Sequence, residues 1–245
     1  MELTILGKYG PFPKEGGACS SYLLRHGGKT ILIDCGSGAL SRLQKFVSLQ
    51  DIGLILLSHL HYDHISDMLI LRYALEGLKA RGAAVSLPVP VYMPDTPEEP
   101  AKLIASCPVF EMHRITNDTA LKFGEMKITF REMTHPVPSY AMRFEAKKRA
   151  FVYSGDTNMN DDIVPFAKGA ELLLMEAGLL ERDKKDANAP HVSAREAGLI
   201  AGEAKIPNMV ATHLNPGYYE GEVLSELAVH YKNAIIAREM ETINI

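Results

Sequence analysis

Six of the nine histidines of this 245-residue chain lie where a strand pattern stops and a loop or helix begins. The densest group directly follows the short apolar run 54–57, which is typical of a buried strand, and consists of His59, His61, Asp63 and His64. Four such side chains on one loop can all point at one pocket. Imidazole nitrogen and carboxylate oxygen suit zinc and its neighbours in the transition series. A polar surface turn is the alternative, but histidines with a purely structural role usually occur singly. The pattern therefore predicts a metal site at the end of this strand.

Strand and helix patterns alternate in both halves of the chain. Apolar alternation and short apolar runs predict strands over residues 19–25, 29–34, 54–57, 127–134, 140–146, 149–154, 172–175 and 209–213. Helical apolar spacing predicts helices over residues 38–49, 65–79, 193–205 and 222–232. Six prolines between residues 88 and 108 require short elements there. No Gly/Ser-rich or charged linker divides the halves, so residues 1–245 are predicted to form a single α/β domain of two packed sheets with helices outside.

The composition limits the partners and the compartment. A net charge of -4 provides no general attraction to phosphate backbones, so a nucleic-acid substrate would need a local basic patch or a metal. Cys19, Cys35 and Cys107 are odd in number and form no Cys-x-x-Cys pair, which argues against a disulfide framework and for a reducing compartment. We find no signal-peptide pattern and no apolar run of roughly 20 residues. We therefore expect a cytoplasmic protein with no membrane partner.

The segment His59-Leu-His61-Tyr-Asp63-His64 resembles the HxHxDH signature of the metallo-β-lactamase superfamily. Four further motifs of that family occur in order along residues 19–216, and their key residues are Asp34, His135, Asp156 and His213. The resemblance implies the four-layer αββα metallo-β-lactamase sandwich, in which two mixed sheets are covered by helices on the outside.

The resemblance also implies a site for two divalent metal ions. Zn²⁺ is the first expectation and Mn²⁺ the alternative. One ion would be held by His59, His61 and His135. The other would be held by Asp63, His64 and His213, with Asp156 between the two. Two cations about 3.5–4 Å apart need a bridging carboxylate and a bridging hydroxide, and the hydroxide is the nucleophile.

Three of the residues in these motifs have simpler alternatives. His135 and His213, each taken alone, are equally compatible with ordinary buried or loop histidines. Asp34 would support the metal loop, or would be a helix N-cap or turn residue.

Three features resemble the ribonuclease Z and phosphodiesterase branch of the superfamily. Asp156 rather than Cys stands at the bridging position, residues 18–24 resemble that branch, and Glu176 is followed by His191-Val-Ser193. The resemblance implies that His191 contacts a phosphate oxygen or protonates the leaving oxygen while Glu176 orients its ring. Catalysis is thereby assigned to Asp63, His191 and Glu176. A histidine at a helix start and a solvated strand-end carboxylate are the alternatives for the last two.

The chain departs from ribonuclease Z between His135 and Asp156, where only twenty residues stand. The tRNA endonucleases carry a long Gly-rich and basic arm there, whereas this chain has a tight turn at Lys147-Lys148-Arg149, either solvated or in contact with substrate. We therefore expect a small or short phosphodiester as substrate. RNA remains open despite the lack of a large basic surface, and a homodimer is expected from the resemblance alone. The alternatives are a thioester, lactone or β-lactam hydrolase and a non-enzymatic metal-binding protein.

Overall fold

A computed structural model describes residues 1–245 and contains two seven-stranded sheets. The first sheet has the order β14-β1-β2-β3-β4-β5-β6 and the second the order β13-β12-β11-β10-β9-β8-β7. The strands are β1 Glu2–Gly7, β2 Ser21–His26, β3 Lys29–Ile33, β4 Leu54–Leu56, β5 Val89–Met93, β6 Phe110–Arg114, β7 Ala120–Phe123, β8 Met126–Met133, β9 Ser139–Ala146, β10 Arg149–Tyr153, β11 Leu172–Glu176, β12 Asn208–Thr212, β13 Ile235–Ile236 and β14 Thr242–Asn244.

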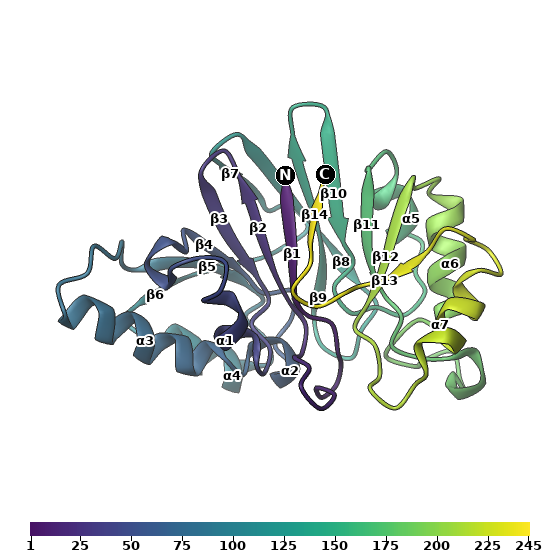
Figure 1. Cartoon of the computed structure of the whole chain (residues 1–245), viewed down its shortest axis with the longest axis horizontal. Helices are drawn as coiled ribbons and strands as arrows, with labels where there is room; N and C mark the ends of the chain where they lie inside the picture. Colours follow the sequence, from purple (N-terminus) through teal and green to yellow (C-terminus); the bar gives the residue numbers. More distant parts are fainter.

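Helices cover the outer face of each sheet. In Figure 1, α1, α3 and α4 lie in the lower left part of the molecule, below β4, β5 and β6, and α5, α6 and α7 lie on the right. The helices are α1 Ala39–Leu43, α2 Tyr62–Ile65, α3 Met68–Ala80, α4 Glu98–Ala105, α5 Ile163–Ala167, α6 Ala194–Glu203 and α7 Glu220–Leu227, with 3-10 turns at Leu49–Asp51 and Glu181–Asp183. The four-layer αββα sandwich is thereby confirmed.

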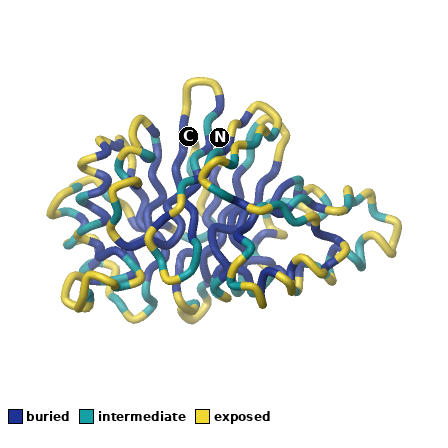
Figure 2. Tube along the Cα trace, turned by 180° about the vertical axis from the view of Figure 1, so that it is seen from behind, coloured by how far each residue is buried: buried dark blue, intermediate teal, exposed yellow.

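Three hydrophobic cores hold the layers together, and strand alternation creates them. In β3, Ile31 and Ile33 face the core between the sheets, whereas Leu32 faces the core under α1, α3 and α4. Leu173 of β11 faces the third core, under α5, α6 and α7. Each fully buried side chain of this size stabilises the fold by about 1.5–3 kcal/mol. Figure 2 shows the result, with buried strands in the centre and exposed residues on the outer loops and helices.

Both sheets are mixed, and in both the parallel strands run from the middle of the sheet to one edge. Strands β3 to β6 pair in parallel in the first sheet, and β10 to β13 do so in the second. Antiparallel pairs complete each sheet, including β1 with β14, which joins the two ends of the chain. Because parallel strands end at the same edge of a sheet, the segments that follow β3, β4, β10, β11 and β12 gather there.

All four predicted helices are shorter in the structure: those expected over residues 193–205 and 222–232 span Ala194–Glu203 and Glu220–Leu227, and the other two differ for reasons that the contacts show. The helix expected over residues 65–79 begins at Met68, because Asp67 is hydrogen-bonded to the loop after β3 and to α1. Its backbone N–H donates to the carbonyl of Cys35, and its carboxylate accepts from the N–H of Leu40. The helix expected over 38–49 ends at Leu43, and the following residues turn back to pack on the outer core of the first sheet.

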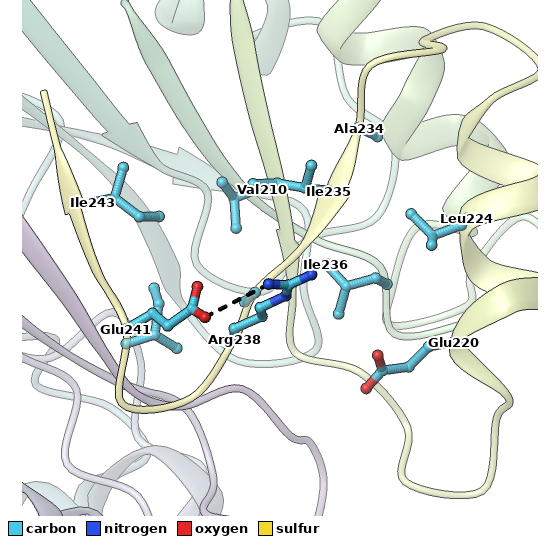
Figure 3. Close-up of a pocket in the computed structure, with 11 residues that line it drawn as sticks. Val210, Glu220, Leu224, Ala234, Ile235, Ile236, Arg238, Glu241 and Ile243 are labelled. Atoms are coloured by element: carbon cyan, nitrogen blue, oxygen red, sulfur yellow. Dashed lines mark ion pairs between the residues drawn. The ribbon is translucent and has the colours of Figure 1, made fainter.

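The proline-rich middle forms short elements, as predicted, namely β5, α4 and β6. Strands β1, β7, β13 and β14 were not predicted. Where β13 and β14 approach each other, a depression of about 410 Å³ opens between the sheet edges (Figure 3). None of the helices combines the length and the apolar character that crossing a bilayer requires.

Candidate metal centre

The predicted site residues lie at one edge of the sandwich, at the lower edge in Figure 1, where α2 lies. Six of them mark the ends of six different strands: Asp34 after β3, His59 after β4, His135 after β8, Asp156 after β10, Glu176 in β11 and His213 after β12. Residues far apart in the chain therefore meet at this edge. The structure brings together all seven residues that the resemblance assigned to metal binding.

The first triad consists of His59, His61 and His135, whose nitrogen atoms are close enough to share one ion. The His61 Nδ1 atom lies 3.2 Å from His59 Nε2 and 3.1 Å from His135 Nε2. The Nδ1–H of His135 donates to the carbonyl of Pro190 at 2.9 Å. Since a carbonyl only accepts, this bond leaves the lone pair of His135 on Nε2, facing the other two rings.

The second triad consists of Asp63, His64 and His213. The His213 Nε2 atom lies 3.4 Å from His64 Nε2 and 3.2 Å from Asp63 Oδ2. The Nδ1 of His64 lies 2.8 Å from the carboxylate of Asp34, which directs its Nε2 into the triad.

Asp156 lies between the two triads. Its Oδ2 atom is 3.5 Å from His59 Nε2 and 3.4 Å from His64 Nε2, and its Oδ1 atom is 3.3 Å from His213 Nδ1. This carboxylate is buried, and Oδ1 has no hydrogen-bond donor. A buried carboxylate oxygen without a donor is costly, and a cation bound in an adjacent triad would satisfy it.

The protonation states fit metal binding. Burial lowers the pKa of His135 to about 4 and that of His213 to about 3, and it also lowers the pKa of His59 and His61. These rings are therefore neutral near pH 7, which is the form that binds metals. Burial opposes charge on His64 as well, but three facing carboxylates raise its pKa above the usual value. A cation among the same carboxylates would take the place of that proton.

Asp34 supports the metal loop. Its backbone is left-handed, with φ 52°, and its side chain is buried. One oxygen accepts from the Ser58 N–H at 2.7 Å. The other accepts from the Ser58 hydroxyl at 2.9 Å, the Tyr153 hydroxyl at 2.7 Å and His64 Nδ1. Asp34 thus orients His64 and the strand that precedes His59, so it is neither a helix N-cap nor a solvated turn residue.

Glu176 and His191 form a pair beside Asp156. The His191 Nδ1 atom lies 3.0 Å from Glu176 Oε1 and 3.9 Å from Asp156 Oδ2. Glu176 is fully buried, so it is not a solvated carboxylate, and it accepts from the N–H groups of Thr157 at 2.6 Å and Gly178 at 3.1 Å. Burial opposes charge on His191, but Glu176 prevails and raises its pKa to about 9. His191 therefore lies over the triads as an imidazolium whose Nε2 is free of Glu176.

Sequence reasoning missed several residues that complete the site. Gly10 lies against His213, and a Cβ there would be 1.8 Å from His213 Nε2. Gly36 lies against the backbone of Asp63, where a Cβ would be 2.0 Å from the carbonyl oxygen. Tyr153 and Ser58 hold Asp34. Of these residues, only Ser58 could have been suspected from the sequence, because it directly precedes His59.

Comparison with known proteins agrees with this geometry. The beta-lactamase superfamily domain matches residues 29–214. The probable metallo-hydrolase YhfI of Bacillus subtilis is 34% identical over 214 residues, which cover 87% of each chain. The chain belongs to the beta-lactamase superfamily. The crystal structure of the YhfI protein, described as a metallo-beta-lactamase fold protein, aligns with a TM-score of 0.92 at 30% identity over 99% of this chain and 98% of that one.

The resemblance to ribonuclease Z within this superfamily is also confirmed. A ribonuclease Z of Methanothermobacter thermautotrophicus is 26% identical over 284 residues, covering 93% of this chain and 91% of its own length. The short form of human tRNase Z shares the beta-lactamase superfamily fold, with a TM-score of 0.79 at 21% identity over 100% of this chain and 99% of that one. Between His135 and Asp156, the present chain contains only β9, β10 and their connections, with the tight turn at Lys147 and Lys148 as predicted.

Proposed function

We propose that the protein is a metal-dependent phosphodiesterase that hydrolyses small or short phosphodiesters, such as a cyclic nucleotide or the end of an RNA. The first triad would hold one divalent ion and the second triad the other, with Asp156 shared between them. The nitrogen-rich donor set suits Zn²⁺, with Mn²⁺ as the alternative. When bound, the ions would activate a water molecule and neutralise charge on the phosphate.

The observation that carries this proposal is the position of His191. Its Nδ1 is engaged by Glu176 at 3.0 Å, so its Nε2–H is the group left to face a substrate over the triads. A phosphodiester needs both a donor to its negatively charged oxygens and a proton for the leaving alkoxide. An imidazolium held by a buried carboxylate meets both needs. Glu176 keeps the ring in place through the two backbone donors that fix its own carboxylate.

Asp63 completes the proposed assignment. Burial raises the pKa of its carboxyl, and its Oδ2 faces His64 and His213. We assign to Asp63 the role of the general base that accepts the proton of the attacking water, while His191 delivers a proton to the leaving oxygen. Asp63 lies in α2 and His191 in the loop before α6, so the proposed base and acid act from two different segments.

A substrate panel tests the reaction class. Metal-loaded protein is assayed with bis-p-nitrophenyl phosphate, a lactone and nitrocefin in one buffer. We expect kcat/KM to be highest for the phosphodiester. A larger value for the lactone or nitrocefin would replace phosphodiester hydrolysis with the alternative chemistry.

The His191→Ala variant tests the proposed mechanism. It should keep both metals and lose roughly 10²–10⁴-fold in kcat on a substrate with an alkoxide leaving group. The loss should be smaller for p-nitrophenolate, which needs little protonation. His230→Ala, at an exposed histidine, is the matched control. Equal small losses on both substrates would make His191 structural, and loss of metal would make it a ligand.

The short interval before Asp156 leads to a substrate preference. Because no arm stands there to grip tRNA, precursor tRNA should be cleaved with a lower kcat/KM than a cyclic nucleotide or bis-p-nitrophenyl phosphate. A clearly higher value for precursor tRNA would contradict this choice of substrate.

A further inference from the structure

The segment that carries His191 has little regular structure of its own. Between β11 and α6 it forms only the 3-10 turn Glu181–Asp183 and an isolated β-bridge between Leu179 and Ser193. Its position therefore depends on contacts with neighbouring segments. The N–H of Val192 donates to the carbonyl of Thr157 at 2.8 Å, and the amide of Asn158 donates to the carbonyl of Ala187 at 2.6 Å. These bonds place His191 beside the loop that carries Asp156.

Lys184 connects this segment to both of its neighbours. Its side chain is only 10% exposed, although it is a lysine in a surface loop. The ammonium donates to Asn158 Oδ1 at 2.5 Å and to Glu196 Oε2 at 2.5 Å. Asn158 lies two residues after Asp156, and Glu196 lies in the first turn of α6. Lys184 therefore bridges the Asp156 loop and α6, which begins three residues after His191.

Glu196 transmits this contact to the start of α6. Its carboxylate also accepts from the N–H of Ser193 at 2.8 Å, and the Ser193 hydroxyl accepts from the Glu196 N–H, which together form a capping box. Ser193 is separated from His191 by one residue. A shift of the Lys184 ammonium would thus be passed to the backbone next to His191 through a single side chain. Lysine is almost never buried unless it is paired, which indicates that Glu196 and Asn158 offset the cost of burying the Lys184 ammonium.

We propose that Lys184 is a positioning residue that holds the His191 imidazole over the metal centre. The inference rests on the proposed function, in which His191 protonates the leaving oxygen. Lys184 itself has no hydrogen bond to any residue of the two triads. Its effect is therefore exerted through the placement of His191, where a displacement of about 1 Å can cost roughly 10²-fold in rate.

The test uses full-length, metal-loaded Lys184→Met protein, with Lys185→Met as matched control, since Lys185 is exposed. We expect Lys184→Met to keep its metals and its KM. Its kcat should fall ~10–100-fold on an alkoxide leaving group and clearly less on p-nitrophenolate. In a His191→Ala background, Lys184→Met should cause no additional loss, because the two residues act through one proton transfer. Equal losses on the two substrates, or an additional loss in the His191→Ala background, would overturn the proposal.

A second readout does not depend on activity. In metal-free protein, hydrogen exchange of the Val192 amide should become faster in Lys184→Met and stay unchanged in Lys185→Met. Unchanged exchange in Lys184→Met would contradict the proposed bridge. If Lys184→Met fails to fold, Glu196→Gln keeps the capping box and weakens the ion pair. The same selective loss on the alkoxide substrate then supports the proposal, and a uniform loss overturns it.

The two hypotheses fail in different ways. If His191→Ala shows no dependence on the leaving group, the proposed function fails and this inference fails with it. If His191→Ala shows that dependence and Lys184→Met does not, only the role of Lys184 is wrong.

Discussion

The metal centre and the depression in Figure 3 differ in how deeply their charged groups are buried. At the metal centre, His59, His64 and Asp156 are at most 1% exposed, and their polar atoms converge. In the depression, the walls are mostly apolar, and the charged pair at its mouth is exposed: Arg238 by 77% and Glu241 by 59%, with 3.6 Å between them. Burying ionisable groups is costly unless they are paired or bind an ion. The comparison shows why converging buried charges, rather than an open apolar volume, mark the candidate functional site.

The largest expected effect comes from removing a group at the centre of the first triad. His61→Ala should lose metal and abolish hydrolysis, because His61 Nδ1 faces both other rings. Elemental analysis and a phosphodiester assay on the purified variant measure both effects. The exposed His230→Ala should behave as wild type. Two metals per chain retained in His61→Ala would remove His61 from the metal site.

Asp34→Asn should lower the metal affinity, although Asp34 is not one of the proposed metal ligands. Asn tolerates the left-handed backbone at this position. Its amide group would, however, replace a carboxylate whose one oxygen accepts from Ser58, His64 and Tyr153 in the wild type. We expect metal affinity to fall about 10–100-fold. Tyr153→Phe, which removes one of these donors, should cost only about 1 kcal/mol of the free energy of unfolding. Metal titration and urea unfolding distinguish the two variants, and equal metal affinity in wild type and Asp34→Asn would refute the role of Asp34.

Acid should destabilise the metal-free protein through its buried neutral histidines. The pKa values of His135 and His213 fall to about 4 and about 3, whereas an unfolded histidine titrates near 6.5. Between about pH 6.5 and pH 4 the unfolded chain binds protons that the folded chain does not. Stability should therefore fall as the pH falls, by up to about 1.4 kcal/mol per pH unit for each such ring. His191, with its pKa raised to about 9, has the opposite sign: its stabilising contribution is full below about pH 6.5 and is lost progressively as the pH rises from there to about 9.

Urea unfolding at several pH values checks this dependence. Comparison with His213→Asn isolates one ring, because the variant should have the shallower slope below pH 6.5. Identical slopes would show that His213 is not held neutral in the folded state.

The smallest effect is expected in the depression. Arg238→Ala breaks an exposed ion pair, so the free energy of unfolding should change by less than about 0.5 kcal/mol. Metal content and hydrolysis should be unchanged, which the same elemental analysis and phosphodiester assay would show. A loss of hydrolysis in Arg238→Ala would assign a function to the depression and break the comparison.

Local patterns predicted the parts of the fold on which the site depends. Apolar runs located β4, β11 and β12, and the polar residues that follow such strands must lie at the edge where parallel strands end. Strands β4, β10 and β12 bring His59, Asp156 and His213 to that edge, whereas their assignment as metal ligands came from the resemblance to the metallo-β-lactamase motifs. Strands β1 and β14 were missed because their stability comes from pairing the two ends of the chain, which no local pattern reports.

Other details depend on contacts between distant segments. Nothing near Gly10 in the sequence indicates that it lies against His213, and nothing near Tyr153 indicates that its hydroxyl donates to Asp34. The helix expected over residues 65–79 began later than its apolar spacing suggested, because Asp67 bonds to the loop after β3. Tertiary hydrogen bonds overrode local helix preference there.

The position of the ions tests the central claim most directly. Anomalous diffraction at the zinc edge, from crystals of the protein loaded with Zn²⁺, locates each ion without reference to activity. We predict two peaks, one within His59, His61 and His135 and one within Asp63, His64 and His213, with Asp156 between them. A single peak, or peaks that lie away from both triads, would contradict the two-metal centre.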